Sequence, residues 1–312
     1  MGLFSLFSNN KNQEKNQEKK LESKIDGEKI FLKKPFFTSR IEYIPESDSF
    51  EIEDIFVEPG QYFRAKETIL TVGSLIHGSG ILSISLPFSG QLEKIYLETG
   101  GSIGLNEQIL SVIKIENNQF IENKLFEQNK EQLNQTEVGL LTDEFTDEKT
   151  ICFTKIAGQE TQYFHLYRHK ADFALEFLGL TFTNHNGYPY LSLVSTSKEL
   201  PLSKGDSIIF LFENKEKLEI VFNSASNGKG YWRTNNTKLT SESLQIFLKS
   251  NLVKAKISNN RKNIYDIYVL DHEFKRNYNE DYQPQYYSLL EGQYLIKLMT
   301  SKFIKINLDN KI

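Results

Sequence analysis

The chain has 312 residues, a formal net charge of −4 and one cysteine. The length allows two ordinary domains, and the slightly negative charge provides no general attraction to phosphate backbones, so nucleic acid is not an expected partner. A single cysteine excludes an intrachain disulfide and a cysteine-based zinc site, and it favours a reducing, cytoplasmic compartment.

The first 29 residues read as a disordered or frayed polar tail. Within them, residues 8–24 are low in complexity and contain the sequence NQEK twice. Such a segment cannot bury enough apolar surface to offset its ordering entropy. No stretch of the chain approaches the ~20 apolar residues that a membrane-spanning helix needs, and the start lacks the basic and long apolar regions of a secretion signal. We therefore expect no membrane span.

Residues 30–115 are rich in short apolar runs and contain a duplication. The sequence EDIFVEPGQYFRAKETILTV occupies 53–72, and EKIYLETGGSIGLNEQILSV occupies 93–112. Aligned without a gap, the copies are identical at 8 of 20 positions, whereas composition alone gives about one or two. Because the shared residues include glycines and glutamates in register, the copies are a repeat rather than two unrelated strands.

Each copy has the pattern of a strand, a tight turn and a second strand. Gly60 and Gly100 stand where the turn requires a positive φ. Apolar residues such as Ile55 and Ile95 alternate with polar ones, as expected of half-buried strands. Two such halves, related by a pseudo-twofold axis, can each cover the apolar face of the other.

Residues of about 50–113 resemble the biotinyl/lipoyl attachment domain, also called the barrel-sandwich hybrid or single hybrid motif. The resemblance rests on VEPGQYFRAKETIL and on LPFSGQLEKIYLETGGSIGLNEQILSVI, with Gly60, Gly90 and Gly100 as structural turns. It implies a flattened β-barrel of two quasi-symmetric four-stranded sheets. In that family a lysine at the tip of the hairpin between the two halves carries the cofactor.

This chain departs from the family at the hairpin tip. The tip contains Ile76, His77, Gly78 and Ser79, and no lysine lies between Lys66 and Lys94. Attachment requires a lysine ε-amine, because serine would give a labile ester and imidazole a still more labile acyl-imidazole. We therefore expect no covalent cofactor.

Residues 116–150 read as a polar, acidic linker containing at most one helix. The acidic pairs Asp143-Glu144 and Asp147-Glu148 are interpreted there as solvated charge. Residues 151–312 then form a β-rich α+β domain that resembles no family. Hairpins are predicted over 178–197 and 207–222, and a helix is predicted to begin at Thr240 or Ser241.

Two candidate sites remain in this second domain. His165 and His169 are four residues apart and share one face of a helix or a strand, so they are candidate metal ligands. The alternative is that both are structural or surface histidines, since the glutamate of a zinc-protease motif is missing. Cys152 stands in an apolar run and reads as a small buried hydrophobic residue.

The sequence thus predicts a mostly β, non-catalytic protein. Its degenerate biotinyl/lipoyl-like domain is expected to serve as an interaction or assembly module for a protein partner. Two alternatives stay open: a biotin or lipoyl carrier subunit that uses another lysine, and an enzyme whose site lies in the C-terminal domain.

Overall fold

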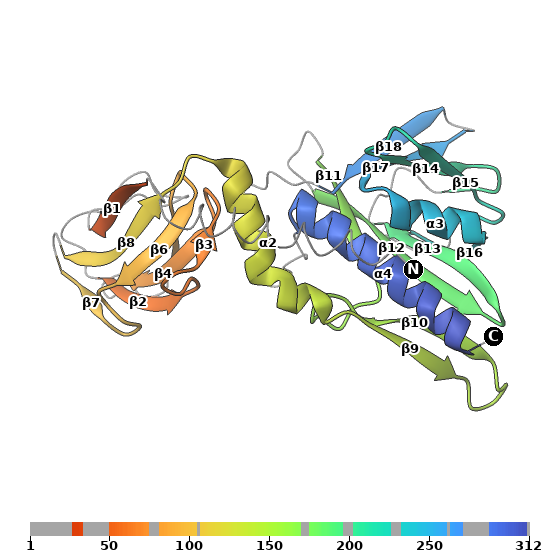
Figure 1. The fold of residues 1–312 in the computed structure, drawn as a ribbon, viewed down its shortest axis with the longest axis horizontal. Helices are drawn as coiled ribbons and strands as arrows, with labels where there is room; N and C mark the ends of the chain where they lie inside the picture. Colours follow the sequence, from red (N-terminus) through yellow and green to blue (C-terminus); the bar gives the residue numbers. More distant parts are fainter. Residues whose placement is uncertain are drawn as a thin grey trace, which may run out of the picture. The chain divides into compact units, whose positions relative to one another are not determined.

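The structure is a computed structural model, and it describes residues 27–33, 50–74, 81–104, 107–169, 175–195, 202–225, 232–260, 263–270 and 287–310. The chain divides into two compact units, Met1–Gln128 and Asn129–Ile312. The division falls within helix α2 (Asn118–Asn134). The described residues are mostly β-strand, and every strand pairing is antiparallel (Figure 1).

Unit 1 contains two four-stranded sheets, which Figure 1 shows in red to yellow. The first sheet consists, in order, of β1 (Glu28–Lys33), β8 (Gln108–Lys114), β6 (Gly90–Ile95) and β3 (Tyr62–Phe63). The second consists of β5 (Ile81–Ser85), β4 (Thr68–Ser74), β2 (Phe50–Ile55) and β7 (Ser102–Ile103). The described strands do not close into the expected flattened barrel, because no hydrogen-bonded ladder joins the two sheets.

The two sheets of unit 1 repeat each other's pairing forty residues apart. In the β2–β4 ladder Ile55 lies opposite Leu70, and in the β6–β8 ladder Ile95 lies opposite Leu110. Each ladder has a β-bulge at the same place, where one extra residue strengthens the local twist. The repeat in the sequence is therefore also a repeat of hydrogen bonds.

The turn glycines connect the two repeats to each other. Gly60 has a φ of +91° and donates its N–H to the carbonyl of Leu92 at 2.7 Å. Gly100 has a φ of +82° and donates to the carbonyl of Ile52 at 2.8 Å. Each turn thus bonds to the strand of the other copy, which is the reciprocity that a pseudo-twofold axis requires.

Gly90 has a different role from the turn that the sequence suggested. It is the first residue of β6, and a Cβ built on it would lie 2.5 Å from the carbonyl oxygen of Ile113 and 3.0 Å from the Phe63 ring. Close packing of backbone and ring, rather than a positive φ, therefore requires glycine at this position.

The core of unit 1 is made almost entirely of aliphatic side chains. Its members include Ile52, Leu70, Val72, Ile84, Leu92, Ile109, Leu110 and Val112, together with the rings of Phe50 and Phe63. The first half of α2 packs on the same unit. Ile121 and Leu125 are buried with Ile115, and Arg64 donates two hydrogen bonds to the carboxylate of Glu122.

Unit 2 is built on one ten-stranded sheet. Its main path is β15-β14-β17-β18-β11-β12-β10-β9, and β13 joins β12 to β16. The strands are β9 (Glu137–Thr142), β10 (Lys149–Lys155), β11 (Phe164–His169), β12 (Leu175–His185), β13 (Tyr188–Ser195), β14 (Ser207–Phe212), β15 (Lys217–Val221), β16 (Trp232–Lys238), β17 (Leu252–Asn259) and β18 (Ile264–Val269).

Both predicted hairpins are confirmed. In the β12–β13 hairpin His185 pairs with Tyr188, and Asn186 and Gly187 between them both have positive φ, as a tight hairpin turn requires. In the β14–β15 hairpin Leu211 pairs with Lys217.

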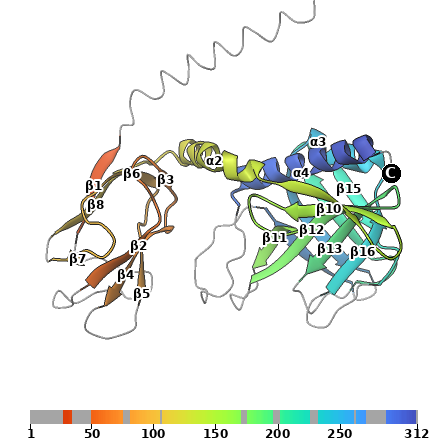
Figure 2. The same ribbon diagram turned by 90° about the horizontal axis from the view of Figure 1, so that it is seen from below.

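Two helices cover one face of the unit 2 sheet, and Figures 1 and 2 show them on the same side. Helix α3 (Ser241–Lys249) begins at Thr240, whose hydroxyl accepts a hydrogen bond from the Ser243 N–H, so this N-cap prediction is confirmed. Helix α4 (Leu289–Asn310) is the second of these helices. The ring of Phe247 lies edge-on to the rings of three strand residues, Phe182, Phe210 and Phe212.

The expected linker over 116–150 is instead largely structured. It contains α2, all of β9 and the start of β10. The sequence looked polar because β9 lies at the end of the strand order and its turn is exposed to solvent. Buried side chains such as Leu133 are too widely spaced in this stretch to give an amphipathic pattern.

Candidate functional site

The hairpin tip of unit 1, with Ile76, His77, Gly78 and Ser79, lies outside the described residues. The strands on either side of it are described: β4 ends at Ser74, β5 begins at Ile81, and Gly73 pairs with Ile81. Residues 75–80 connect these two strands, and it is in this connection that the resemblance would place the modified lysine of the family.

The nearest lysine on each side of this segment belongs to one of the two repeats: Lys66 to the first and Lys94 to the second. Lys66 has a φ of +64°, and its N–H donates to the carbonyl of Leu86 at 2.6 Å. Lys94 belongs to β6, and its ammonium lies 4.8 Å from the ring centroid of Tyr96.

The two histidines proposed as metal ligands both lie on β11. His165 is packed among aromatic rings, 4.6 Å from the centroid of Phe177, and burial lowers the pKa of His165 to about 4. Its imidazole is therefore neutral at physiological pH. Of His169 only the backbone is described. Among the described residues, no group of three potential ligands gathers around either histidine.

A polar groove of about 520 Å³ lies on the face of the unit 2 sheet opposite the helices. Neighbouring strands each contribute residues spaced by two, so their side chains share one face. These residues are Thr150 and Cys152 of β10, Thr183 and His185 of β12, and Tyr190 and Ser192 of β13. Leu141 and Glu148 complete the rim on the side of the β9–β10 hairpin.

The groove is equipped for hydrogen bonding rather than for nucleophilic attack. The Thr150 hydroxyl lies 3.0 Å from Nδ1 of His185, and the hydroxyls of Thr183 and Ser192 lie 3.4 Å apart. Burial raises the pKa of the Cys152 thiol, which keeps it protonated and weakly nucleophilic. Cys152 is buried in a strand, as its sequence context suggested.

A buried ionic network lies on the helix-covered face of the same sheet. Arg168 on β11 forms ion pairs with Glu176 on β12 and Asp266 on β18. The phenol of Tyr268 lies 3.3 Å from the Ser195 hydroxyl, and burial, followed by the two carboxylates, raises the pKa of Tyr268 to about 12. The ion pairs connect three neighbouring strands, and burial keeps the phenol in its protonated form.

Sequence reasoning missed both the groove and the network. Their members come from strands that are distant in the chain, and no local spacing signals them. No described helix is long and apolar enough to cross a membrane.

Comparison with known proteins adds no relative. The chain matches no protein-family model, no curated protein and no solved structure. The functional argument therefore rests on the residues and their geometry.

Proposed function

We propose that the chain is a non-catalytic interaction or assembly protein whose unit 1 is a degenerate biotinyl/lipoyl-like module. The observation that supports this most directly is the shared hydrogen-bond pattern of the two repeats combined with the lysine-free bend between them. The duplicated ladders support the resemblance to that family, whereas the segment between β4 and β5, at which the family carries its modified lysine, contains no amine for attachment chemistry.

An exposed aromatic patch on unit 1 is the surface that we assign to this function. The rings of Phe31 on β1 and Tyr96, which follows β6, lie 6.4 Å apart, and each has a lysine ammonium over it. Lys29 also pairs with Glu93 at 2.6 Å, and this bond lowers the pKa of the Glu93 carboxyl. Exposed aromatic rings bordered by charge are typical of protein-interaction surfaces.

The second unit supports a non-catalytic reading in a more limited way. The thiol of Cys152 and the phenol of Tyr268 both have raised pKa values, so neither is prepared for nucleophilic or general-base chemistry at neutral pH. His165 is enclosed by rings rather than by further ligands.

The patch can be tested by affinity purification with quantitative mass spectrometry from cells that naturally produce the chain. We compare the wild-type chain with a Phe31→Ser/Tyr96→Ser variant and with a Val221→Ser/Ile264→Ser control, whose sites are exposed on unit 2. We expect a protein that is enriched with the wild type and the control and is lost with the patch variant. Equal recovery of the partner with all three chains would show that the patch does not bind it.

A further inference from the structure

The β9–β10 hairpin of unit 2 presents an unprotected strand edge. Among the described strands β9 pairs with β10 alone, so its other backbone edge is available to a further strand. Edge strands are commonly protected by charged residues, and β15, at the opposite end of the strand order, carries Lys217 and Glu219. In β9 the one charged residue, Glu137, pairs with Lys155 of β10, and the exposed residues nearest the turn include the apolar Leu140 and Leu141.

The tip of this hairpin holds an aromatic ring in solvent. Phe145 is 96% exposed, although its turn is well defined. The Asp143 carboxylate accepts hydrogen bonds from the N–H groups of Phe145 at 2.8 Å and Thr146 at 2.9 Å. These bonds lower the pKa of Asp143. An aromatic side chain on a preorganised turn loses little conformational entropy on binding, which suits it to anchor a partner.

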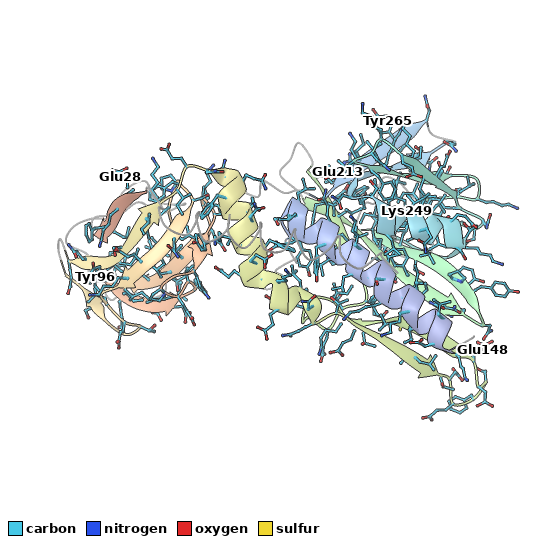
Figure 3. All side chains as sticks on the ribbon, in the orientation of Figure 1. Glu28, Tyr96, Glu148, Glu213, Lys249 and Tyr265 are labelled. Carbon is cyan, nitrogen blue, oxygen red and sulfur yellow. The ribbon has the colours of Figure 1, made fainter. Side chains whose placement is uncertain are left out.

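The charge around the ring is strongly acidic. The turn between β9 and β10 holds four exposed carboxylates, those of Asp143, Glu144, Asp147 and Glu148. Figure 3 labels Glu148 at this end of the hairpin, where the side chains project away from the rest of the unit. A partner that covers Phe145 must bring positive charge to this rim, because like charges at an interface oppose association.

The polar groove described above continues from the same hairpin. Leu141 and Glu148 line it together with Thr150. A strand added to β9 would direct alternate side chains to the two faces of the sheet. The side chains on one face would then point toward the groove, and those on the other toward the side of the sheet that carries the helices.

We propose that the β9 edge and the acidic tip bind an extended, basic segment of a partner protein. The segment adds to the sheet as an eleventh strand through backbone hydrogen bonds. The apolar side chains on the groove face of the segment contact Leu141, and its lysines or arginines reach the carboxylates of the tip. This inference goes beyond the proposed function, because it assigns a docking surface to unit 2 that is independent of the aromatic patch on unit 1.

A basic segment fits this edge better than a second copy of the chain does. Pairing β9 with its own copy would join two hairpins whose turns each carry four exposed carboxylates. The chain as a whole is also negative, with a net charge of −4. Charge complementarity therefore favours a heterologous, positively charged occupant.

The test measures binding of a labelled peptide of alternating lysine and valine to the full chain by fluorescence anisotropy. We expect binding at about 50 mM salt that weakens at about 500 mM, as ionic contacts are screened. In the Glu144→Lys/Glu148→Lys variant we expect an affinity loss of about tenfold or more. These two positions avoid Asp143, which orders the turn, and Asp147, which has a positive φ.

Three controls separate the docking surface from general charge attraction. The Glu219→Lys/Asp309→Lys variant makes the same change in net charge at exposed sites elsewhere in unit 2 and should bind like the wild type. A Lys–Val peptide with alternate backbone nitrogens methylated keeps its charge but loses ladder hydrogen bonds, and should bind more weakly. Hydrogen exchange should show new protection of β9 amides in the complex.

The proposal is overturned if the Lys–Val peptide does not bind, if the two variants lose affinity equally, or if protection appears away from β9. It is also overturned if sedimentation velocity shows a dimer that depends on Leu141, since a second copy would then occupy the edge. None of these outcomes bears on the aromatic patch of unit 1, which the affinity purification tests separately.

Discussion

Units 1 and 2 are both antiparallel β structures, but their sequences encode them in different ways. In unit 1 the same strand–turn–strand sequence occurs twice, and the two copies together form one aliphatic core. In unit 2 helices α3 and α4, which follow most of the strands in the chain, cover one face of a single sheet. An aromatic cluster centred on Phe247 lies between helix and sheet. Strand pairing between distant residues can therefore be predicted from a duplicated sequence such as that of unit 1. It cannot be predicted in the same way for the unrepeated sheet of unit 2.

The largest expected effect is on unit 2 and comes from removing the ring at its centre. Phe247 is fully buried, so Phe247→Ala should cost about 3–5 kcal/mol of the free energy of unfolding. Trp232, the only tryptophan, belongs to unit 2, so its fluorescence in a urea titration reports this unit. Hydrogen exchange of β8 amides reports unit 1, which should keep its protection.

The matched control is Leu308→Ala, because Leu308 is 71% exposed on α4. This variant should unfold within about 0.5 kcal/mol of the wild type. Equal loss of protection in β8 and in the unit 2 strands after Phe247→Ala would contradict two separate cores.

Acid should destabilise unit 2 through His165. Burial lowers the pKa of His165 to about 4 in the folded chain, whereas an unfolded histidine has a pKa near ~6.5. Between these values the unfolded chain binds a proton that the folded chain does not. Stability is therefore complete above pH ~6.5 and falls as the pH decreases toward 4, by on the order of 3 kcal/mol in total.

Urea titrations of the wild type and a His165→Gln variant between about pH 7 and pH 4 measure this effect, since glutamine does not titrate near neutrality. The variant should show a shallower pH dependence over that interval. The same slope in both chains would show that other groups, such as carboxylates, account for the acid sensitivity.

Because unit 1 is a repeat, the same substitution at equivalent turn glycines should lower the free energy of unfolding by similar amounts. Gly60→Ala and Gly100→Ala each place a Cβ on a residue with positive φ, and the space around both is open, with nothing closer than 3.6 Å to either added atom. Each should lower the free energy of unfolding of unit 1 by about 1–2 kcal/mol from backbone strain alone. Thermal denaturation followed by hydrogen exchange in β4 and β8 measures both, and very unequal costs would break the correspondence of the two turns.

The smallest effect concerns the start of α3. Thr240 caps the helix by accepting the Ser243 N–H at 3.2 Å, so Thr240→Ala should cost about 1 kcal/mol. Thr240→Ser keeps the hydroxyl and should retain most of the stability. If the serine variant loses as much as the alanine variant in a urea titration, the cap contributes little.

The parts of the fold that the sequence predicted are those fixed by local chemistry. The turn at Asn186-Gly187 requires positive φ at both residues, and the cap at Thr240 requires a side-chain acceptor, so each could be recognised from a few neighbouring residues. In unit 1 the duplicated sequence also predicts that two halves distant in the chain pack on each other.

The remaining parts depend on partners that no local pattern contains. Strand β9 was read as linker because an edge strand with an acidic turn has the composition of a solvated loop. Arg168 and Asp266 are nearly a hundred residues apart and meet only through the strand order of the completed sheet. The groove at Cys152 likewise exists only after β10, β12 and β13 are side by side.

The central claim is our proposal that unit 1 is a degenerate biotinyl/lipoyl-like module that carries no covalent cofactor. Intact-mass spectrometry of the full chain, after co-expression with a biotin ligase and separately with a lipoate ligase in cofactor-supplemented cells, tests it most directly. The account predicts the unmodified mass in both cases. A biotinyl or lipoyl adduct on any lysine, abolished by replacing that lysine with arginine, would contradict the account and identify the chain as a carrier subunit.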